Sequence, residues 1–186
     1  DHRDLHSFPT RRSSDLLSSF QLHSMSCRPD VAVITNISPN HLDKHRDFQD
    51  YIDAKRSIFL NQTESDRLIL FADDSHTPYY ASQAKSRLSL FSDSQAVSQG
   101  CICENGVISL VSAGERLPVM RAEEVRIPGQ HNIRNILAAF EAVRDDVPPE
   151  ICREVAMTFP GVPHRLEEIR VLNGVRYIND SIASSP

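Results

Sequence analysis

The sequence predicts an α/β fold built around a parallel sheet. Three short runs rich in apolar and β-branched residues, 31–37, 67–73 and 87–92, alternate with segments of helical character. Continuously apolar runs are typical of strands buried on both faces of a parallel sheet, and the alternation of strand and helix is typical of βαβ units. The length of 186 residues leaves room for roughly one domain and part of another.

The two helices between these strands are predicted from periodicity. Apolar residues recur at three- and four-residue spacing over 48–62, and a second helix is expected over 77–85. After Gln99 the sequence changes to short segments in which apolar and polar residues alternate, as in half-buried strands. Asn105-Gly106 indicates a hairpin turn between two of these segments. We therefore expect a small antiparallel flap after the third strand.

Two further helices are expected over 132–143 and 149–159, followed by a second hairpin around Asn173-Gly174. The segment FPGVPHR, residues 159–165, is the best candidate for a linker between domains. The chain shows no internal repeat.

Composition excludes several classes of partner. The net charge is -5, with 20 Lys and Arg against 25 Asp and Glu, and the basic residues form no block. Nucleic-acid grooves and membrane-surface patches need concentrated positive charge, so we expect neither nucleic acid nor membrane as a partner. No apolar run is long enough to span a bilayer, and no secretory signal opens the chain. The four cysteines are expected to be reduced thiols of a cytoplasmic protein.

The first sixteen residues, 1–16, do not read as part of a fold. They have neither helical nor strand periodicity and resemble the conceptual translation of a short-read sequencing adapter. The alternative is a natural basic, Ser-rich tail. We expect a non-native, disordered segment and exclude it from the fold.

Lys55 lies in the middle of the apolar stripe of the helix predicted over 48–62. In one interpretation its stem packs and its ammonium reaches solvent. In the other, burial lowers the pKa of the amine and makes it a group that can be modified or act covalently.

Two histidines, His41 and His45, follow the first strand, where open α/β sheets place their ligand crevice. They could form a metal pair or be ordinary polar residues of a loop. A His-based metallohydrolase would need a third ligand at recognisable spacing, which the sequence does not offer.

The stretch GQHNIRN, residues 129–135, places Asn132 and Asn135 on one face at the start of a helix. Free N–H groups and amide side chains there suit an anion or a purine edge, although simple capping by Asn132 would explain the same pattern. Arg165 and Asp180 flank the second hairpin and are expected to approach each other, either for function or as a structural salt bridge. Cys101 and Cys103 are expected to serve packing.

Several motifs occur in a fixed order from Leu17 to Pro186: SSFQL, NISPNHLDKH, YIDAK, ADD, IPGQHN, GVPHRLE and NDSIASSP. In this order the chain resembles the Mur ligase family of peptidoglycan synthesis, in the branch that adds D-glutamate. The resemblance implies that residues 17–160 are most of a central ATPase domain of the P-loop type. It also implies that residues 161–186 begin a Rossmann-like C-terminal domain with their hairpin.

The resemblance implies an ATP-dependent ligase. ATP would phosphorylate the carboxylate of UDP-N-acetylmuramoyl-L-alanine, and the amine of D-glutamate would attack the acyl phosphate to form the amide, with Mg²⁺ on the phosphates. By motif match, His41 and Lys55 would be catalytic magnesium ligands, Lys55 as a carbamate formed with carbon dioxide. Asn135 would contact adenine beside Asn132, and Arg165 with Asp180 would reach ATP when the domains close.

The chain also departs from the family pattern. The family's phosphate loop belongs upstream of Leu17, and Leu16 stands where the family has a metal-binding Glu. Phe71 and Ile182 also differ from residues that many members carry. We therefore expect the 186-residue chain to be catalytically inert and only marginally folded, and the full-length parent to be a monomer. The alternative is a non-catalytic domain that binds a nucleotide or a partner.

Overall fold

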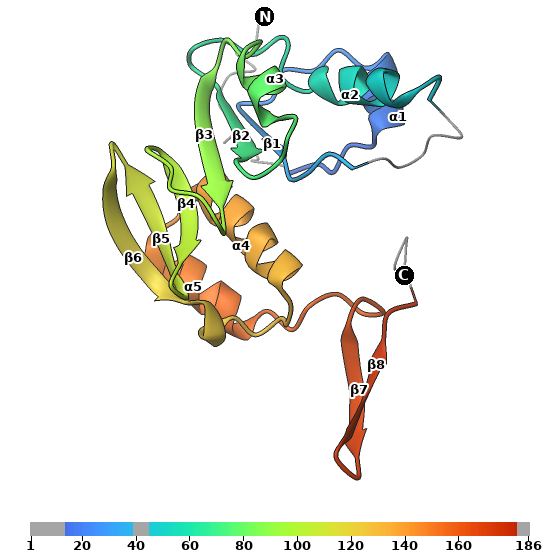
Figure 1. Cartoon of the computed structure of the whole chain (residues 1–186), viewed down its shortest axis with the longest axis vertical. Helices are drawn as coiled ribbons and strands as arrows, with labels where there is room; N and C mark the ends of the chain where they lie inside the picture. Colours follow the sequence, from blue (N-terminus) through green and yellow to red (C-terminus); the bar gives the residue numbers. More distant parts are fainter. Residues whose placement is uncertain (1–13, 39–44, 182–186) are drawn as a thin grey trace, which may run out of the picture.

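The computed structural model describes residues 14–38 and 45–181 and shows an α/β arrangement with a separate hairpin (Figure 1). Its helices and strands follow in the order α1 (Ser19–Ser24), β1 (Val31–Ile34), α2 (Phe48–Arg56), β2 (Arg67–Phe71), α3 (Thr77–Ala81), β3 (Arg87–Ser92), β4 (Gly100–Glu104), β5 (Val107–Ser112), β6 (Glu115–Arg121), the 3₁₀ turn η1 (Ala122–Glu124), α4 (Gln130–Val143), α5 (Pro149–Thr158), β7 (Glu167–Leu172) and β8 (Val175–Asn179).

The main sheet has six strands in the order β1-β2-β3-β4-β5-β6. Strands β1 to β4 pair in parallel, whereas β4, β5 and β6 pair antiparallel. The expected antiparallel part is present as β4, β5 and β6, and it is continuous with the parallel sheet because β4 also pairs with β3. Only the last three residues of β3, Leu90 to Ser92, pair with β4. Because the pairing begins at Leu90, the chain has to return by only two residues from the end of β3, and the short connection over 93–99 is long enough for this.

Gly100 makes the close approach of β3 and β4 possible. Its φ is 146°, and a Cβ at this position would lie 1.6 Å from the carbonyl oxygen of Leu90. No other residue type fits without moving the backbone of one strand. The sheet therefore depends on a glycine at the join between its parallel and antiparallel parts.

Helices cover both faces of the sheet and create two apolar clusters. On one face, residues of α2 and α3 pack on the first strands; the largest members of this cluster are Tyr51, Phe59, Leu68, Leu70 and Tyr80. On the other face, α4 and α5 pack across the strands β2 to β6; the largest members of this second cluster are Phe71, Phe91, Met120, Leu137 and Phe140. Strand β2 is buried throughout, as its continuously apolar sequence predicts.

A buried ionic cluster fastens α4 to the sheet. Glu141 is fully buried and accepts hydrogen bonds from the hydroxyl of Ser89 and from the guanidinium of Arg144 at 2.9 Å. Arg67 lies 3.6 Å from the same carboxylate and donates to the carbonyl oxygens of Glu141 and Ala142. Burial raises the pKa of Glu141, although the hydrogen bond from Ser89 and the nearby guanidinium of Arg144 oppose this effect.

The helix α2 ends earlier than its periodicity predicts. The helix ends at Arg56, and the chain continues as a series of turns. Gln62 is expected at the end of the helix, but its side chain is buried in the protein interior. The amide nitrogen of Gln62 donates to the carbonyl oxygens of Pro29 and Arg67, and its amide oxygen accepts from Ser86. The side chain of Gln62 thus supplies hydrogen bonds to buried carbonyl oxygens near the start of β2. It can do so because the helix ends before residue 62.

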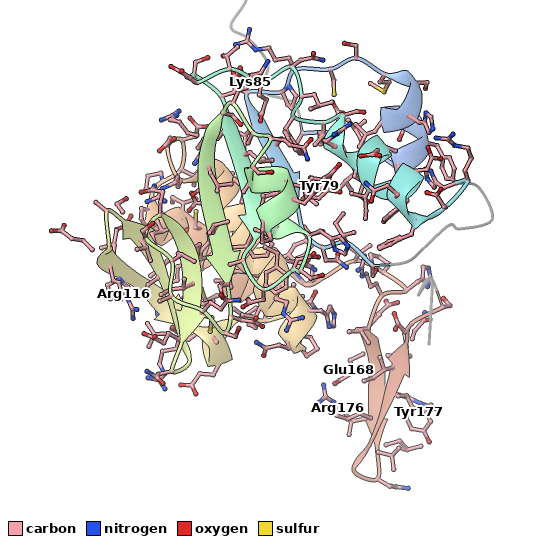
Figure 2. All side chains as sticks on the ribbon, turned by 45° about the horizontal axis from the view of Figure 1, so that its top comes forward. Tyr79, Lys85, Arg116, Glu168, Arg176 and Tyr177 are labelled. Carbon is pink, nitrogen blue, oxygen red and sulfur yellow. The ribbon has the colours of Figure 1, made fainter. Side chains whose placement is uncertain are left out.

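The hairpin β7–β8 lies apart from the main sheet, at the end of a linker (Figure 1). Asn173 and Gly174 both have positive φ, as the expected turn requires. Arg176 donates to Glu168 across the strands at 2.7 Å, and the side chains of the hairpin are largely exposed (Figure 2). Among the described residues, no helix has the length and apolar character needed to cross a bilayer.

Candidate functional site

Acidic residues gather where the parallel strands end. Asp73 and Asp74 follow β2, and Asp93 follows β3. Asp74 accepts hydrogen bonds from the backbone N–H of Ile37 at 2.6 Å and of His76 at 2.8 Å, so it joins the loop after β1 to the end of β2. In open α/β sheets the ligand crevice lies at this carboxyl edge. The edge is therefore held together by polar contacts between successive strand ends.

Asp73 links the ends of β2 and β3. Its carboxylate accepts hydrogen bonds from Ser92, at 2.8 Å, and from Ser94. Burial acts to raise the pKa of Asp73, but the hydrogen bonds from Ser94 and Ser92, together with those from Gln95 and the backbone of Asp93, lower the pKa below its ordinary value. Asp73 is therefore an ionised acceptor at neutral pH.

The amino end of α4 is anchored to the same edge of the sheet. Asp93 accepts from the amide of Gln130 and from the guanidinium of Arg134, both at 2.7 Å. The N-cap position is Gly129, whose φ of 100° and close approach to the ring of His131 favour glycine. The free N–H groups of α4 thus begin beside the end of β3, which is suitable for binding an anion.

Asn132 and Asn135 are brought together on α4. The amide of Asn135 donates to that of Asn132 at 3.5 Å, and Asn132 donates to the carbonyl oxygen of Pro128 at 2.6 Å. The interpretation of Asn132 as the helix cap is wrong, because Gly129 takes that place and the helix begins at Gln130. Asn135 is exposed and carries both a donor and an acceptor, so it can pair with the edge of a base.

Lys55 is half-buried near the end of α2. Its Nζ lies 5.3 Å from the centroid of the Tyr51 ring, and burial lowers the pKa of the amine. In the part of the chain that the structure describes, Lys55 forms no ion pair with a carboxylate. A lowered pKa raises the neutral fraction of the amine, and the neutral amine is the form that adds to carbon dioxide.

The other expected site residues divide into two groups. His41 lies outside the described residues. Arg165 and Asp180 lie at the same end of the β7–β8 hairpin, where Asp180 accepts from the backbone N–H of Leu166 at 3.1 Å. Within residues 14–38 and 45–181, no ion pair joins Arg165 to Asp180, and no hydrogen bond connects this end of the hairpin to Lys55 or to the asparagines of α4.

No sequence pattern assigns a role to Asp93, Gln130 and Arg134, although these residues position the start of α4. A signal was present in the sequence, because Asp93 directly follows the third predicted strand and the IPGQHN motif opens the helix. Only the fold, however, brings the end of β3 and the start of α4 together. The separation of these two segments along the sequence does not predict that Asp93 contacts α4.

Taken together, the mostly parallel sheet and the helix that begins at its carboxyl edge define an α/β protein whose candidate ligand crevice lies at that edge. The family described as the Mur ligase middle domain matches residues 12–143. The chain belongs to this Mur ligase family.

Curated relatives support the same family. The chain is 44% identical to the UDP-N-acetylmuramoylalanine--D-glutamate ligase of Acetivibrio thermocellus over 170 residues, which cover 91% of this chain and 36% of that protein. It is 47% identical to the protein of the same name from Clostridium kluyveri, with the same coverage. The chain thus spans about a third of the length of these relatives.

Solved structures share the fold. MurF from Acinetobacter baumannii matches with a TM-score of 0.66 at 19% identity, over 87% of this chain and 35% of that one. MurF from Thermotoga maritima, solved in complex with ADP, matches with a TM-score of 0.58 at 18% identity, over 82% of this chain and 35% of that one.

Proposed function

We propose that the chain is the larger part of the ATPase domain of a ligase that adds D-glutamate to UDP-N-acetylmuramoyl-L-alanine. The observation that carries this proposal is the identity of 44–47% to ligases of that name over 91% of the chain. In this proposal residues 17–160 belong to the central domain and residues 161–186 begin the C-terminal domain.

The proposed reaction forms an amide through an acyl phosphate. The γ-phosphoryl group of ATP passes to the alanyl carboxylate, and the amine of D-glutamate then displaces phosphate. The amino end of α4 would receive ATP, with Asn135 beside the adenine and Asn132 holding the Asn135 amide. Arg165 and Asp180, at the end of the hairpin, would reach the nucleotide when the hairpin approaches the sheet. The use of ATP and the reduced cysteines favour the cytoplasm.

Lys55 would supply a magnesium ligand after carbamylation. Its half-buried amine has no carboxylate partner among the described residues, and conversion to a carbamate removes the cost of holding a buried ammonium. A carbamate is an oxygen ligand, which suits a hard cation, and His41 would be the second protein ligand. Bound Mg²⁺ would neutralise charge on the transferred phosphoryl group.

A chimera tests the proposal. Residues 17–186 replace the matching segment of the Acetivibrio thermocellus ligase, which supplies the remainder of the protein. We expect release of phosphate that depends on both UDP-N-acetylmuramoyl-L-alanine and D-glutamate. A folded chimera that binds both substrates but releases no phosphate would contradict the proposal.

The role of Lys55 is tested in the same chimera. Lys55→Ala should abolish turnover, whereas Lys85→Ala is the matched control, because Lys85 is exposed on the surface (Figure 2). With ¹³C-labelled bicarbonate, a carbamate resonance should appear in the parent chimera and in the Lys85→Ala variant and be absent from the Lys55→Ala variant. Equal turnover of the two lysine variants would overturn the assignment of Lys55.

A further inference from the structure

A cluster of ligating side chains outside this proposed site joins α1 to α2. His23 comes from the last turn of α1, whereas His45 and Asp50 come from the segment that leads into and forms the first turn of α2. One nitrogen of each histidine and one carboxylate oxygen of Asp50 all lie within 4.8 Å of one another. The ligase reaction proposed above uses none of these three residues.

His45 is buried with one ring nitrogen unused. Its side chain is 1% exposed, and its Nδ1 is a buried polar atom without a hydrogen-bond partner. The other nitrogen, Nε2, lies 2.9 Å from the hydroxyl of the buried Ser19. When Nε2–H donates to Ser19, the lone pair of Nδ1 is directed toward Asp50, whose carboxylate oxygen is 3.5 Å away.

Each histidine faces a different carboxylate oxygen of Asp50. His45 Nδ1 lies 3.5 Å from Oδ2, and His23 Nε2 lies 3.5 Å from Oδ1. Ligands bonded at about 2.0–2.2 Å in tetrahedral geometry are separated by roughly 3.4 Å. Both contacts are too long for good hydrogen bonds, but each nitrogen is at a distance from the carboxylate that is compatible with a shared ion.

Packing already holds the buried histidine in place. The ring of His45 stacks on that of Phe20 at 5.2 Å and meets the ring of Tyr51 edge-on at 5.3 Å. With the hydroxyl of Ser19 on the opposite nitrogen, this arrangement has the features of an outer shell that orients a metal-binding histidine. His23 is more exposed, so an ion could enter from its side.

From these observations we propose that His23, His45 and Asp50 form a binding site for a divalent transition metal of the Zn²⁺ class. Imidazole nitrogen and carboxylate oxygen are typical ligands for such an ion, and three protein ligands leave the fourth position open to water. The bound ion would join the end of α1 to the start of α2. Arg46 competes with the ion for this carboxylate, because its exposed guanidinium donates to Oδ1 of Asp50 at 3.1 Å and its backbone N–H donates to Oδ2 at 3.2 Å.

The test is a titration of the 186-residue chain with Zn²⁺ in competition with a chromophoric chelator. We expect one tight site, and His23→Ala should weaken it at least tenfold without unfolding the chain, because the side chain of His23 is 57% exposed. His131→Ala, which removes an exposed histidine on α4, is the matched control and should leave the affinity unchanged. Arg46→Ala should strengthen binding, because it removes the guanidinium from Oδ1 of Asp50 while the backbone N–H of residue 46 still donates to Oδ2.

A second readout identifies the ligand atom. On addition of Zn²⁺, the ¹⁵N resonance of His45 Nδ1 should shift, while Nε2 remains protonated. Equal affinities for the wild type, His23→Ala and His131→Ala would overturn the proposal, and so would a Zn²⁺ titration that leaves the ring of His45 unchanged. In either case the cluster would be only a histidine–aspartate contact between two helices.

Discussion

Removing the carboxylate of Glu141 should strongly destabilise the chain. Glu141→Ala leaves the hydroxyl of Ser89 and the guanidinium of Arg144 without the acceptor that they share in the core. Hydrogen bonds to a charged group contribute about 1.5–3 kcal/mol each, and removal of one partner of a buried ion pair costs about 3–5 kcal/mol. The hydrogen-bond estimate for two contacts and the ion-pair estimate describe the same interactions, so they are not added, and they agree in magnitude.

The structure places the expected loss near the lower end of that range. Arg67 retains the carbonyl oxygens of residues 141 and 142, and Arg144 retains the carbonyl oxygen of Val111 and the hydroxyl of Ser112. Neither cation therefore becomes fully unpaired. We expect the free energy of unfolding to fall by about 3 kcal/mol, and by about 1–2 kcal/mol for Glu141→Gln, which can still accept from Ser89.

The assay is equilibrium unfolding in urea at neutral pH and low protein concentration. Glu154→Ala, which truncates an exposed glutamate on α5, is the control and should change stability by less than about 0.5 kcal/mol. The ordering wild type and Glu154→Ala above Glu141→Gln above Glu141→Ala is the expected result. If Glu141→Ala unfolded at the same urea concentration as Glu154→Ala, the buried cluster would not stabilise the fold.

Three further predictions concern the sheet, its acid sensitivity and the nucleotide. Gly100→Ala should cost more than about 3 kcal/mol. Gly114 also has a positive φ, of 83° against 146° at Gly100, but a Cβ there meets open space, so Gly114→Ala should cost clearly less in the same urea assay. Hydrogen bonds from the side chain of Arg28 and from the backbone and hydroxyl of Thr63 lower the pKa of Asp66 from 3.8 to about 2. The ionised carboxylate therefore stabilises the fold above pH 4 and loses its contribution as the pH falls toward 2. Asp66→Asn should flatten the acid limb of a pH–stability curve, and an unchanged limb would argue against this role of Asp66. The 186-residue chain should show no ATP binding by calorimetry, and measurable affinity would favour a nucleotide-binding module instead.

The strands and the alternation with helices could be predicted from local sequence. The run at β2 is short and buried throughout, as expected for a strand covered on both faces of a parallel sheet, whereas β3 is exposed over its first two residues, Arg87 and Leu88. The ends of the helices could not be predicted in this way. Gln62 leaves the helical path because buried backbone groups near β2 need hydrogen-bond partners, which is a demand of the packed core.

The candidate site divides in the same manner. The position of Lys55 within an apolar stripe makes it a candidate from periodicity alone, and the motif at α4 makes Asn132 and Asn135 candidates; their roles remain predictions. The contact of Asp93 with the start of α4 joins residues 37 and 41 positions apart, and no local pattern predicts it. The same is true of the cluster of His23 with Asp50, which unites two helices that are separate in sequence.

The sequence by itself determined the fold class, the hairpin turns and the family, because these depend on residue periodicity, on the backbone preferences of residues such as Asn-Gly, and on ordered motifs. Tertiary structure alone decided that β4 extends the parallel sheet, that Gly129 rather than Asn132 caps α4, and that a buried histidine nitrogen is directed at Asp50. Each of these features depends on which distant segments meet. Contacts of that kind are selected by the packing of the whole core, and they leave no periodic trace in the local sequence.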